Sequence, residues 1–218
     1  MQFSARPWVN PGSVNKPVQN RPSWRTSFAF PLSTPEARRD LLVGGTLLFL
    51  LPVGWILNLG HRLDVVHRIY HQKHPIFRGF SPWFACFTRG LKAVTAIVIY
   101  LSASIALAAA AYRIMPWLWW PAGVAFVLGV YILPGGMTYN AAFDDIRYLY
   151  RPDKALARAI GGGRGYLHAW LIALVAISLS MLGLLFMGVG VFYTSVWAWM
   201  VVGHAFSVSL SLRDREAA

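Results

Sequence analysis

Long apolar stretches alternate with shorter basic and aromatic ones along the 218 residues of this chain. Two apolar stretches lie at 91–112 and 117–134, and a third covers 166–209, about twice the length that one bilayer crossing needs. A turn near Gly188-Val189-Gly190 would divide the third stretch into two spans. The pattern predicts an all-α integral membrane protein with four transmembrane helices, at 91–112, 117–134, 167–187 and 191–209.

A second feature occurs twice: an apolar stretch is interrupted at Leu-Pro-x-Gly, an Asn follows, and a basic, aromatic stretch comes next. Proline removes a backbone donor and clashes with the preceding helical turn, so each apolar helix is expected to end or kink there. The likeness fits a duplicated unit, with Asn58 and Asn140 at corresponding positions, or chance, because Leu, Pro and Gly are common in membrane helices. The residues predicted to break the helices are Pro52, Gly54, Pro134 and Gly136.

The first apolar segment, 41–59, is about nineteen residues long and is interrupted at Pro52, so it either crosses the bilayer or enters it and turns back. A full crossing would place the basic N-terminal tail opposite the other basic stretches. Re-entry places every basic cluster on the cytoplasmic side, as the positive-inside rule requires. We therefore favour a broken or re-entrant helix shielded by its neighbours. Both termini would then be cytoplasmic, with the spans in a bacterial inner membrane.

The composition agrees with a membrane location, because 56% of the residues are apolar and only 13% are charged. The formal net charge of +12 is concentrated outside the predicted spans. Anionic lipid headgroups explain charge in that position, so we predict lipid partners and no nucleic acid. One polytopic domain, 33–212, is expected between a Pro-rich basic tail, 1–32, and a short C-terminal tail, 213–218. The N-terminal tail is either free or ordered by a partner.

Two amphipathic helices are expected at the membrane interface, at 61–78 and 138–160, with apolar side chains towards the lipid tails and basic ones towards the headgroups. A Trp-rich turn follows Arg113 and predicts an aromatic belt at the outer interface. The residues expected to face lipid or partner subunits are Arg62, Arg68, Lys73, Arg147, Arg151, Arg164, Trp117, Trp119 and Trp120.

A group of histidines and one acid is the first candidate for bound chemistry. Asp64, His67, His71 and His74 follow one another at spacings of three and four, so they share one face of a helix. Two histidines at i, i+4 beside a carboxylate can bind zinc or another transition metal, with Asp64, His67 and His71 as the ligands. No fourth, distant ligand is evident, and the alternative is an interfacial helix whose imidazoles meet lipid phosphates.

A second candidate is His204, which lies within the last predicted span beside Gly203. A neutral histidine there can ligate the metal of a haem or chlorin, and the ten Trp residues would suit a pigment. The alternative is a hydrogen bond between helices.

Groups typical of catalysis or ion coupling are absent from the predicted spans. None of the eight acidic residues and no Lys or Arg lies centrally in a span, whereas proton relays and ion-coupled carriers keep such groups inside the membrane. The sequence also has no Ser/His/Asp order, zinc-protease helix or nucleophile elbow. We therefore predict that the chain is not an enzyme.

Five stretches carry a resemblance to a known family: Phe28–Pro31, Asp40–Gly54, Leu59–Leu63, Gly90–Ala93 and Gly203–Phe206. Through them the chain resembles the DUF4013-like family of small polytopic membrane proteins from bacteria and archaea, a domain of unknown function. The resemblance covers most of residues 25–207 and implies a polytopic helical fold without a known activity. Members of that family carry an acidic Trp-Asp segment where this chain has 79–84, so the resemblance implies no shared ligand at that loop.

Two functions are compatible with these features. The first is a non-catalytic accessory or scaffolding subunit of a larger membrane protein complex, for which a complex carrying redox or photosynthetic cofactors is one candidate host. The alternative is a small transporter or channel built from the duplicated broken-helix unit, with Asn58 and Asn140 near its substrate site. Apart from the metal and tetrapyrrole candidates, the sequence predicts no cofactor of its own.

Overall fold

The structure, a computed structural model, describes residues 22–216, and every regular element in that range is a helix. In chain order the elements are α1 (Trp24–Ala29), η1 (Phe30–Leu32), α2 (Pro35–Leu47), α3 (Val53–Tyr70), α4 (Trp83–Arg113), η2 (Pro116–Leu118), α5 (Trp119–Phe143), α6 (Ile146–Tyr150), α7 (Pro152–Gly161), α8 (Gly163–Ser180), η3 (Met181–Leu185) and α9 (Gly190–Glu216), where η marks a short 3-10 helix.

Four stretches are long and apolar enough to cross a membrane, namely Trp83–Arg113, Pro116–Phe143, Gly163–Leu185 and Gly190–Ser211. The predicted all-α class and the four long apolar helices are therefore confirmed, and the chain is a multi-pass membrane protein. The turn expected near Gly188 lies between η3 and α9, and Gly188 has a φ of 75°, in the left-handed region that glycine adopts without strain.

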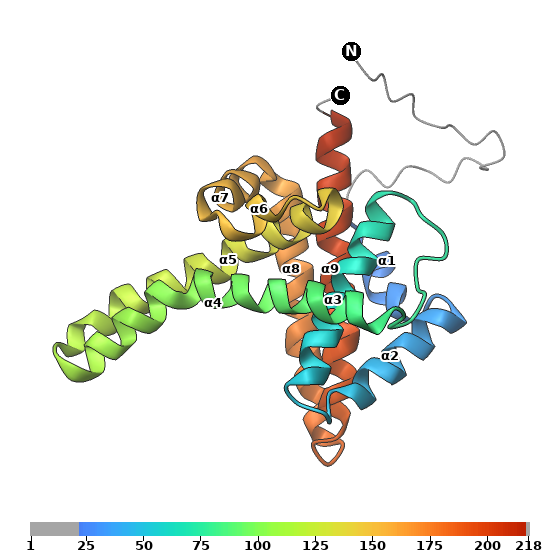
Figure 1. Ribbon diagram of the computed structural model, residues 1–218, viewed down its shortest axis with the longest axis horizontal. Coiled ribbons are helices and arrows are strands. Elements are labelled where there is room, and N and C mark those ends of the chain that lie inside the picture. Colours follow the sequence, from blue (N-terminus) through green and yellow to red (C-terminus); the bar gives the residue numbers. More distant parts are fainter. Residues whose placement is uncertain (1–21, 217–218) are drawn as a thin grey trace.

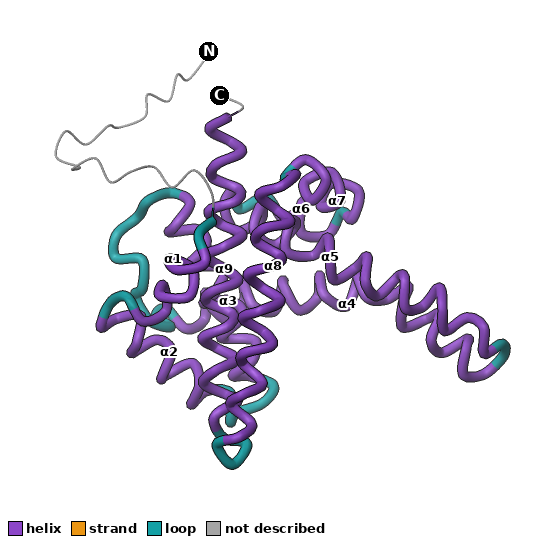
Figure 2. Tube along the Cα trace, turned by 180° about the vertical axis from the view of Figure 1, so that it is seen from behind, coloured by secondary structure: helices purple, strands orange, loops and turns teal. Residues whose placement is uncertain are grey.

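The long helices form two hairpins that point in different directions. Helices α8 and α9 form one, and α2 and α3 pack beside it (Figure 1). Helices α4 and α5 form the other, whose far end around η2 extends away from the rest of the molecule, as the view from behind in Figure 2 also shows. We call the η2 end the tip of the α4–α5 hairpin and the opposite end its root.

Two glycines let α3 and α4 touch through their backbones at the root of that hairpin. A Cβ atom on Gly60 would collide with the carbonyl of Cys86, and a Cβ on Gly90 would collide with the carbonyl of Ile56. Small residues at a helix crossing allow this close approach in membrane proteins. Both glycines belong to stretches that carry the family resemblance.

The interruption expected at Pro52 falls between α2 and α3. Asn58 is 3% exposed, and its Nδ2 donates to the carbonyls of Gly44 at 3.0 Å and Gly54 at 2.8 Å. One side chain therefore ties the end of α2 to the start of α3 and satisfies two backbone acceptors near the turn.

The second predicted interruption is not a helix end, because α5 continues through Pro134 and Gly136 to Phe143. The carbonyl of Tyr131, almost one turn before the proline, accepts hydrogen bonds from the Tyr166 hydroxyl at 2.5 Å and the Trp170 indole at 3.2 Å. Pro134 leaves the carbonyl of Val130 without its intrahelical donor, and the bonds to the next carbonyl hold α8 against α5 beside that point. Proline is tolerated within membrane helices where neighbouring helices bind the backbone in this way. The donors come from α8, which the local pattern around Pro134 does not reveal.

The two predicted interfacial helices have different bounds in the structure. Helix α3 runs continuously across the expected boundary near residue 60, and 71–82 contains no helix. Pro75 and Pro82 explain its absence, because the residue before a proline is disfavoured in the helical conformation. The expected stretch 138–160 is divided among the end of α5, α6 and α7.

Part of the predicted N-terminal tail belongs to the fold. Residues 22–32 form α1 and η1, and Ser27, Phe30 and Pro31 are buried. This segment packs against α9 of the same chain. The remainder of the predicted tail, 1–21, lies outside the described residues.

Candidate functional site

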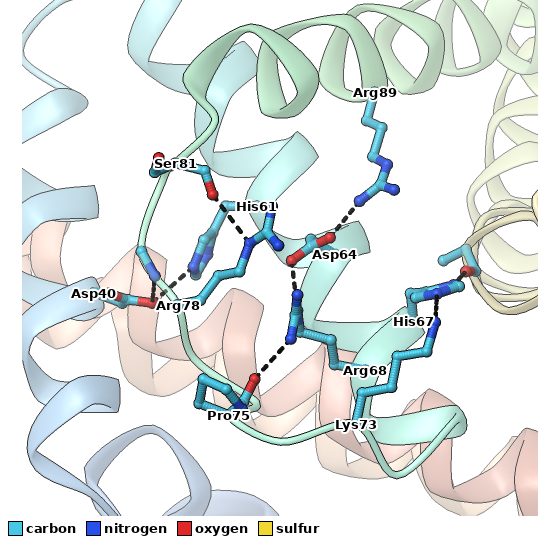
Figure 3. Close-up of polar contacts among 12 residues, drawn as sticks. Asp40, His61, Asp64, His67, Arg68, Lys73, Pro75, Arg78, Ser81 and Arg89 are labelled. Carbon is cyan, nitrogen blue, oxygen red and sulfur yellow. Dashed lines mark hydrogen bonds and ion pairs between the residues drawn. The ribbon is translucent and has the colours of Figure 1, made fainter.

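The polar residues of α3 form a network between α2, α4 and α5, drawn in Figure 3. The helix presents His61, Asp64, His67 and Arg68 within two turns, and each of them bonds to a different part of the chain. Among the described residues, the two fully buried charged or imidazole side chains, Asp40 and His61, both belong to this network, which makes it the first candidate for a functional site.

A buried acid–imidazole pair lies at one end of the network. Asp40 of α2 is 2% exposed, and its Oδ2 accepts from His61 Nε2 at 2.9 Å and from the backbone N–H of Gly79 at 3.0 Å. The His61 ring also stacks on Phe80, with 4.4 Å between centroids. The pair thus joins α2, α3 and the 71–82 loop, as Figure 3 shows for its labelled members.

Asp64 lies at the centre of the network between two arginines. Arg68 Nε donates to one carboxylate oxygen at 3.0 Å, and Arg89 of α4 donates to the other. Burial alone would raise the pKa of Asp64, but the bonds and charges of Arg68 and Arg89 outweigh it and hold that pKa below its usual value. Arg68 also donates to the Pro75 carbonyl at 2.9 Å, so this ion pair holds the 71–82 loop.

His67 and His71 cap the end of α5. The Nδ1–H of His67 donates to the Ala141 carbonyl at 2.8 Å, and Nε2–H of His71 donates to the Ala142 carbonyl at 2.7 Å. The last four carbonyls of a helix have no partner within it, so the two imidazoles satisfy acceptors that α5 leaves open. Because Nδ1 of His67 carries the proton, its Nε2 is free to accept from Lys73 Nζ at 3.1 Å.

The neutral form of His67 is favoured by its surroundings. Burial lowers the pKa of His67 below its ordinary value, the Lys73 ammonium lowers it further, and the bond to Ala141 opposes both effects. A neutral imidazole is also the only form that can accept from Lys73.

The predicted metal ligands are not brought together. Within residues 22–216, no three His, Cys, Asp or Glu side chains lie close enough to hold a metal ion. The ring centroids of His67 and His71 are 4.5 Å apart, but each imidazole donates to a carbonyl of α5. Both carboxylate oxygens of Asp64 are paired with arginines, Arg68 and Arg89. Asp64 and His67 lie on α3 and His71 is the residue after it, whereas His74, predicted on the same helical face, lies in the 71–82 loop. The open end of α5 binds the two imidazoles.

His204, the tetrapyrrole candidate, bonds within the chain. Its Nδ1 lies 3.1 Å from the Ser27 hydroxyl, and its ring lies 4.5 Å from that of Phe30 at an interplanar angle of 30°. Both partners belong to residues 22–32. His204 therefore holds the N-terminal segment on α9.

The residues predicted to face lipid divide into two groups. Lys73, Arg147, Arg151, Arg164, Trp117, Trp119 and Trp120 are exposed. Arg62 and Arg68 are not free for headgroups: Arg62 lies along Gly203 of α9 with its Nε buried and unbonded, and Arg68 is paired with Asp64. Burial also lowers the pKa of Arg62 to about 10.

A polar pocket of about 190 Å³ lies where α3, α4 and α5 meet, at the root of the α4–α5 hairpin. We call it the junction pocket. It is lined by Leu63 and His67 of α3, by Ala85, Thr88, Arg89 and Lys92 of α4, and by Asn140, Ala141, Asp144 and Ile146 at the end of α5 and the start of α6.

Sequence reasoning singled out only part of this pocket. His67 and Asn140 were candidates for other reasons, whereas Arg89, Lys92 and Asp144 were not predicted as site residues. Arg89 and Lys92 are three residues apart on one helix and therefore share a face, which is the signal that points to them. Asp144 follows the helix end at Phe143, which the expected break at Pro134 obscured.

The two asparagines of the expected duplicated unit have different environments. Asn58 is buried at the α2–α3 connection, where its amide donates to two backbone carbonyls, whereas Asn140 lines the junction pocket. Asn58 is not among the residues that line this pocket.

Comparison with family models, with curated proteins and with solved structures finds no match for this chain. The resemblance to the DUF4013-like family therefore stays a prediction.

Proposed function

We propose that the protein is a non-catalytic accessory subunit of a larger membrane protein complex in the bacterial cytoplasmic membrane. One observation carries the proposal: the α4–α5 hairpin is extended and is hardly covered by the rest of the chain. Only 22% of the most apolar 18 residues of α4, and 28% of those of α5, are buried, against 56% for α9. A hairpin of this kind offers a long apolar surface to neighbouring helices.

The outer part of α5 has a shape that suits a helix of another subunit. An open, strongly apolar groove of about 650 Å³ is lined by Trp119, Trp120, Gly123, Val124, Val127 and Leu128. A Cβ on Gly123 would meet no atom of the described residues within 4 Å, so no contact within that part of the chain requires a glycine here. Small residues between large ones allow helices to approach closely in the membrane, where packing drives association.

The short α2–α3 pair supports a re-entrant topology for the first apolar segment. With 13 and 18 residues, α2 and α3 are about 20 and 27 Å long, so α2 is too short for a hydrocarbon core of about 30 Å. The turn between them exposes Phe49, Leu50 and Leu51, and the Phe49 ring packs on Phe192 of α9. We place this apolar turn within the bilayer, beside α9, with its exposed side chains towards the lipid tails.

The basic helices α6 and α7 would then lie at the cytoplasmic interface with both termini. Arg147 and Arg151 are exposed there and can meet anionic headgroups. Complexes that carry redox or photosynthetic cofactors are one class of host. The transporter alternative has no observation in its favour, since Asn58 and Asn140 do not share a site.

The test is a gentle native purification through a C-terminal tag, with mass spectrometry of the co-purified proteins and an absorption spectrum. We expect a stoichiometric set of membrane partners for the wild-type chain. Filling the groove with Gly123→Leu should reduce their recovery at least severalfold, because a leucine side chain occupies the space of the partner helix.

Ile105→Phe, on an exposed position of α4 outside the groove, is the matched control and should leave recovery unchanged. A wild-type protein that purifies alone would overturn the proposal. Equal recovery with Gly123→Leu would reject the groove as the contact surface.

A further inference from the structure

We propose that the junction pocket binds a zwitterionic phosphate–amine headgroup of the ethanolamine phosphate type, with the phosphate at Lys92 and the ammonium at Asp144. The site is independent of the accessory role, since it lies at the root of the α4–α5 hairpin and the partner groove lies towards its tip. Either proposal can therefore fail without the other.

The pocket contains one cation and one anion that the chain leaves unpaired. Among the described residues, neither Lys92 nor Asp144 forms an ion pair, although both line the same cavity. They come from different elements, Lys92 from α4 and Asp144 from the residue after α5. Separated charges of opposite sign in one small cavity fit a ligand that carries the complementary pair.

The remaining groups supply one further cation and two uncharged partners. Arg89 shares the Asp64 carboxylate with Arg68, so one carboxylate faces two guanidinium groups and the α4 side of the pocket, which also carries Lys92, stays positive. Burial and the Lys73 ammonium favour the neutral form of His67. Thr88 and Asn140 supply uncharged donors and acceptors on the two walls. A purely anionic ligand would meet the unpaired carboxylate of Asp144, and a purely cationic one would meet Lys92, so a zwitterion fits best.

The size of the cavity limits the ligand to a small group. About 190 Å³ is below the range of roughly 300–1,000 Å³ that holds drug-sized molecules. A phosphate joined by two carbons to an ammonium is of suitable size and carries one charge for each of Lys92 and Asp144. A choline group is bulkier and has no N–H to donate to the Asp144 carboxylate.

The position of the pocket favours a lipid as the source of this chemistry. It lies beside the first turns of α4 and the end of α5, where the apolar run of α4 begins at Leu91. The Trp-rich tip lies at the opposite end of the same hairpin. A lipid headgroup at the root would leave its acyl chains beside the exposed apolar surfaces of α4 and α5.

The experiment uses delipidated full-length protein in dodecyl maltoside and measures ligand retention by native mass spectrometry. The probes are short-chain phosphatidylethanolamine, phosphatidylglycerol and phosphatidylcholine, together with free phosphoethanolamine. We expect phosphatidylethanolamine to bind roughly tenfold more tightly than the other two lipids, the ratio expected for one charge-assisted hydrogen bond. If free phosphoethanolamine binds as tightly as phosphatidylethanolamine, the ligand is a soluble molecule with this chemistry. If it binds much more weakly than the lipid, the ligand is the lipid headgroup.

Two exposed pocket residues can be changed without removing buried contacts. Asp144→Asn should abolish the preference for phosphatidylethanolamine over phosphatidylglycerol, and Lys92→Gln should weaken binding of all three lipids. Asp153→Asn and Lys154→Gln on α7 remove the same charge types outside the pocket and should bind as the wild type does. The proposal is overturned if the wild type does not prefer the ethanolamine lipid, or if Asp144→Asn keeps that preference.

Discussion

Asp40 and His61 show how one buried pair fixes three segments. The carboxylate has two donors, one on α3 and one in the 71–82 loop, and its side chain is almost fully enclosed. A buried acceptor that loses a donor keeps its desolvation penalty and gains nothing in return. The position of the loop, and hence of Phe80 on the His61 ring, should therefore depend on this pair.

We expect His61→Phe to lower the free energy of unfolding by about 2–3 kcal/mol, because Asp40 is left buried with one donor instead of two. Unfolding of the purified protein in mixed micelles with increasing dodecyl sulfate measures the loss. The double variant Asp40→Leu, His61→Phe should lose less free energy of unfolding than the two single variants together, since it leaves no buried charged group without its partner. Additive losses would show that the two side chains do not act together, and Asp153→Asn, an exposed acid, serves as the control.

The environment of His67 makes the stability of the fold sensitive to acid. Its pKa is lower in the folded chain than in the unfolded one, so the unfolded chain binds more protons between the two values. Stability from this group is fully present above about pH 6.5 and is lost as the pH falls through the folded pKa. We expect unfolding measured at pH 7.5 and at pH 5 to differ less in His67→Gln than in the wild type. The same difference in both proteins would contradict this prediction.

At the scale of elements, the glycine contact between α3 and α4 decides how the root of the α4–α5 hairpin is held. Neither helix can approach the other with a side chain in place, because each glycine faces a carbonyl of the opposite helix. The junction pocket lies beside this crossing, so its walls depend on the spacing of the two helices.

Gly90→Ala should therefore be destabilising by roughly 3 kcal/mol or more, since the new methyl group forces two backbones apart. Gly123→Ala is the matched control: it introduces the same methyl group into open space and should stabilise the fold by about 0.4–1 kcal/mol. Thermal unfolding in detergent would measure both. A Gly90→Ala protein as stable as the wild type would show that α3 and α4 are not in backbone contact.

The sequence predicted those elements that depend on composition alone. Long runs without charge specify membrane spans wherever the rest of the chain lies, and the four long helices follow from them. The course of α5 was not predictable, because the donors to its Tyr131 carbonyl are 35 and 39 residues away. The junction pocket likewise combines residues from 63 to 146, so neither its existence nor its unpaired charges can be read from any local pattern.

At the scale of the whole molecule, the two hairpins differ in how much of their surface the rest of the described chain covers. The α8–α9 hairpin, with α2 and α3 beside it, forms the body of the protein, and its α9 is the most enclosed of the long helices. The α4–α5 hairpin leaves this body and exposes most of its surface. With 31 residues α4 is about 46 Å long, more than a bilayer core requires, which allows a strong tilt against neighbouring subunits.

The docking of residues 22–32 on α9 has a consequence for biosynthesis. A ribosome makes this segment well before the helix that receives it, because 177 residues separate Ser27 from His204. Helices α2 and α3 also pack on α9, so these earlier parts of the chain cannot bury their contact surfaces until α9 has been made. A chain that stops before α9 would leave these surfaces open to membrane proteases, so the docking of α9 distinguishes chains that have passed this point from truncated ones.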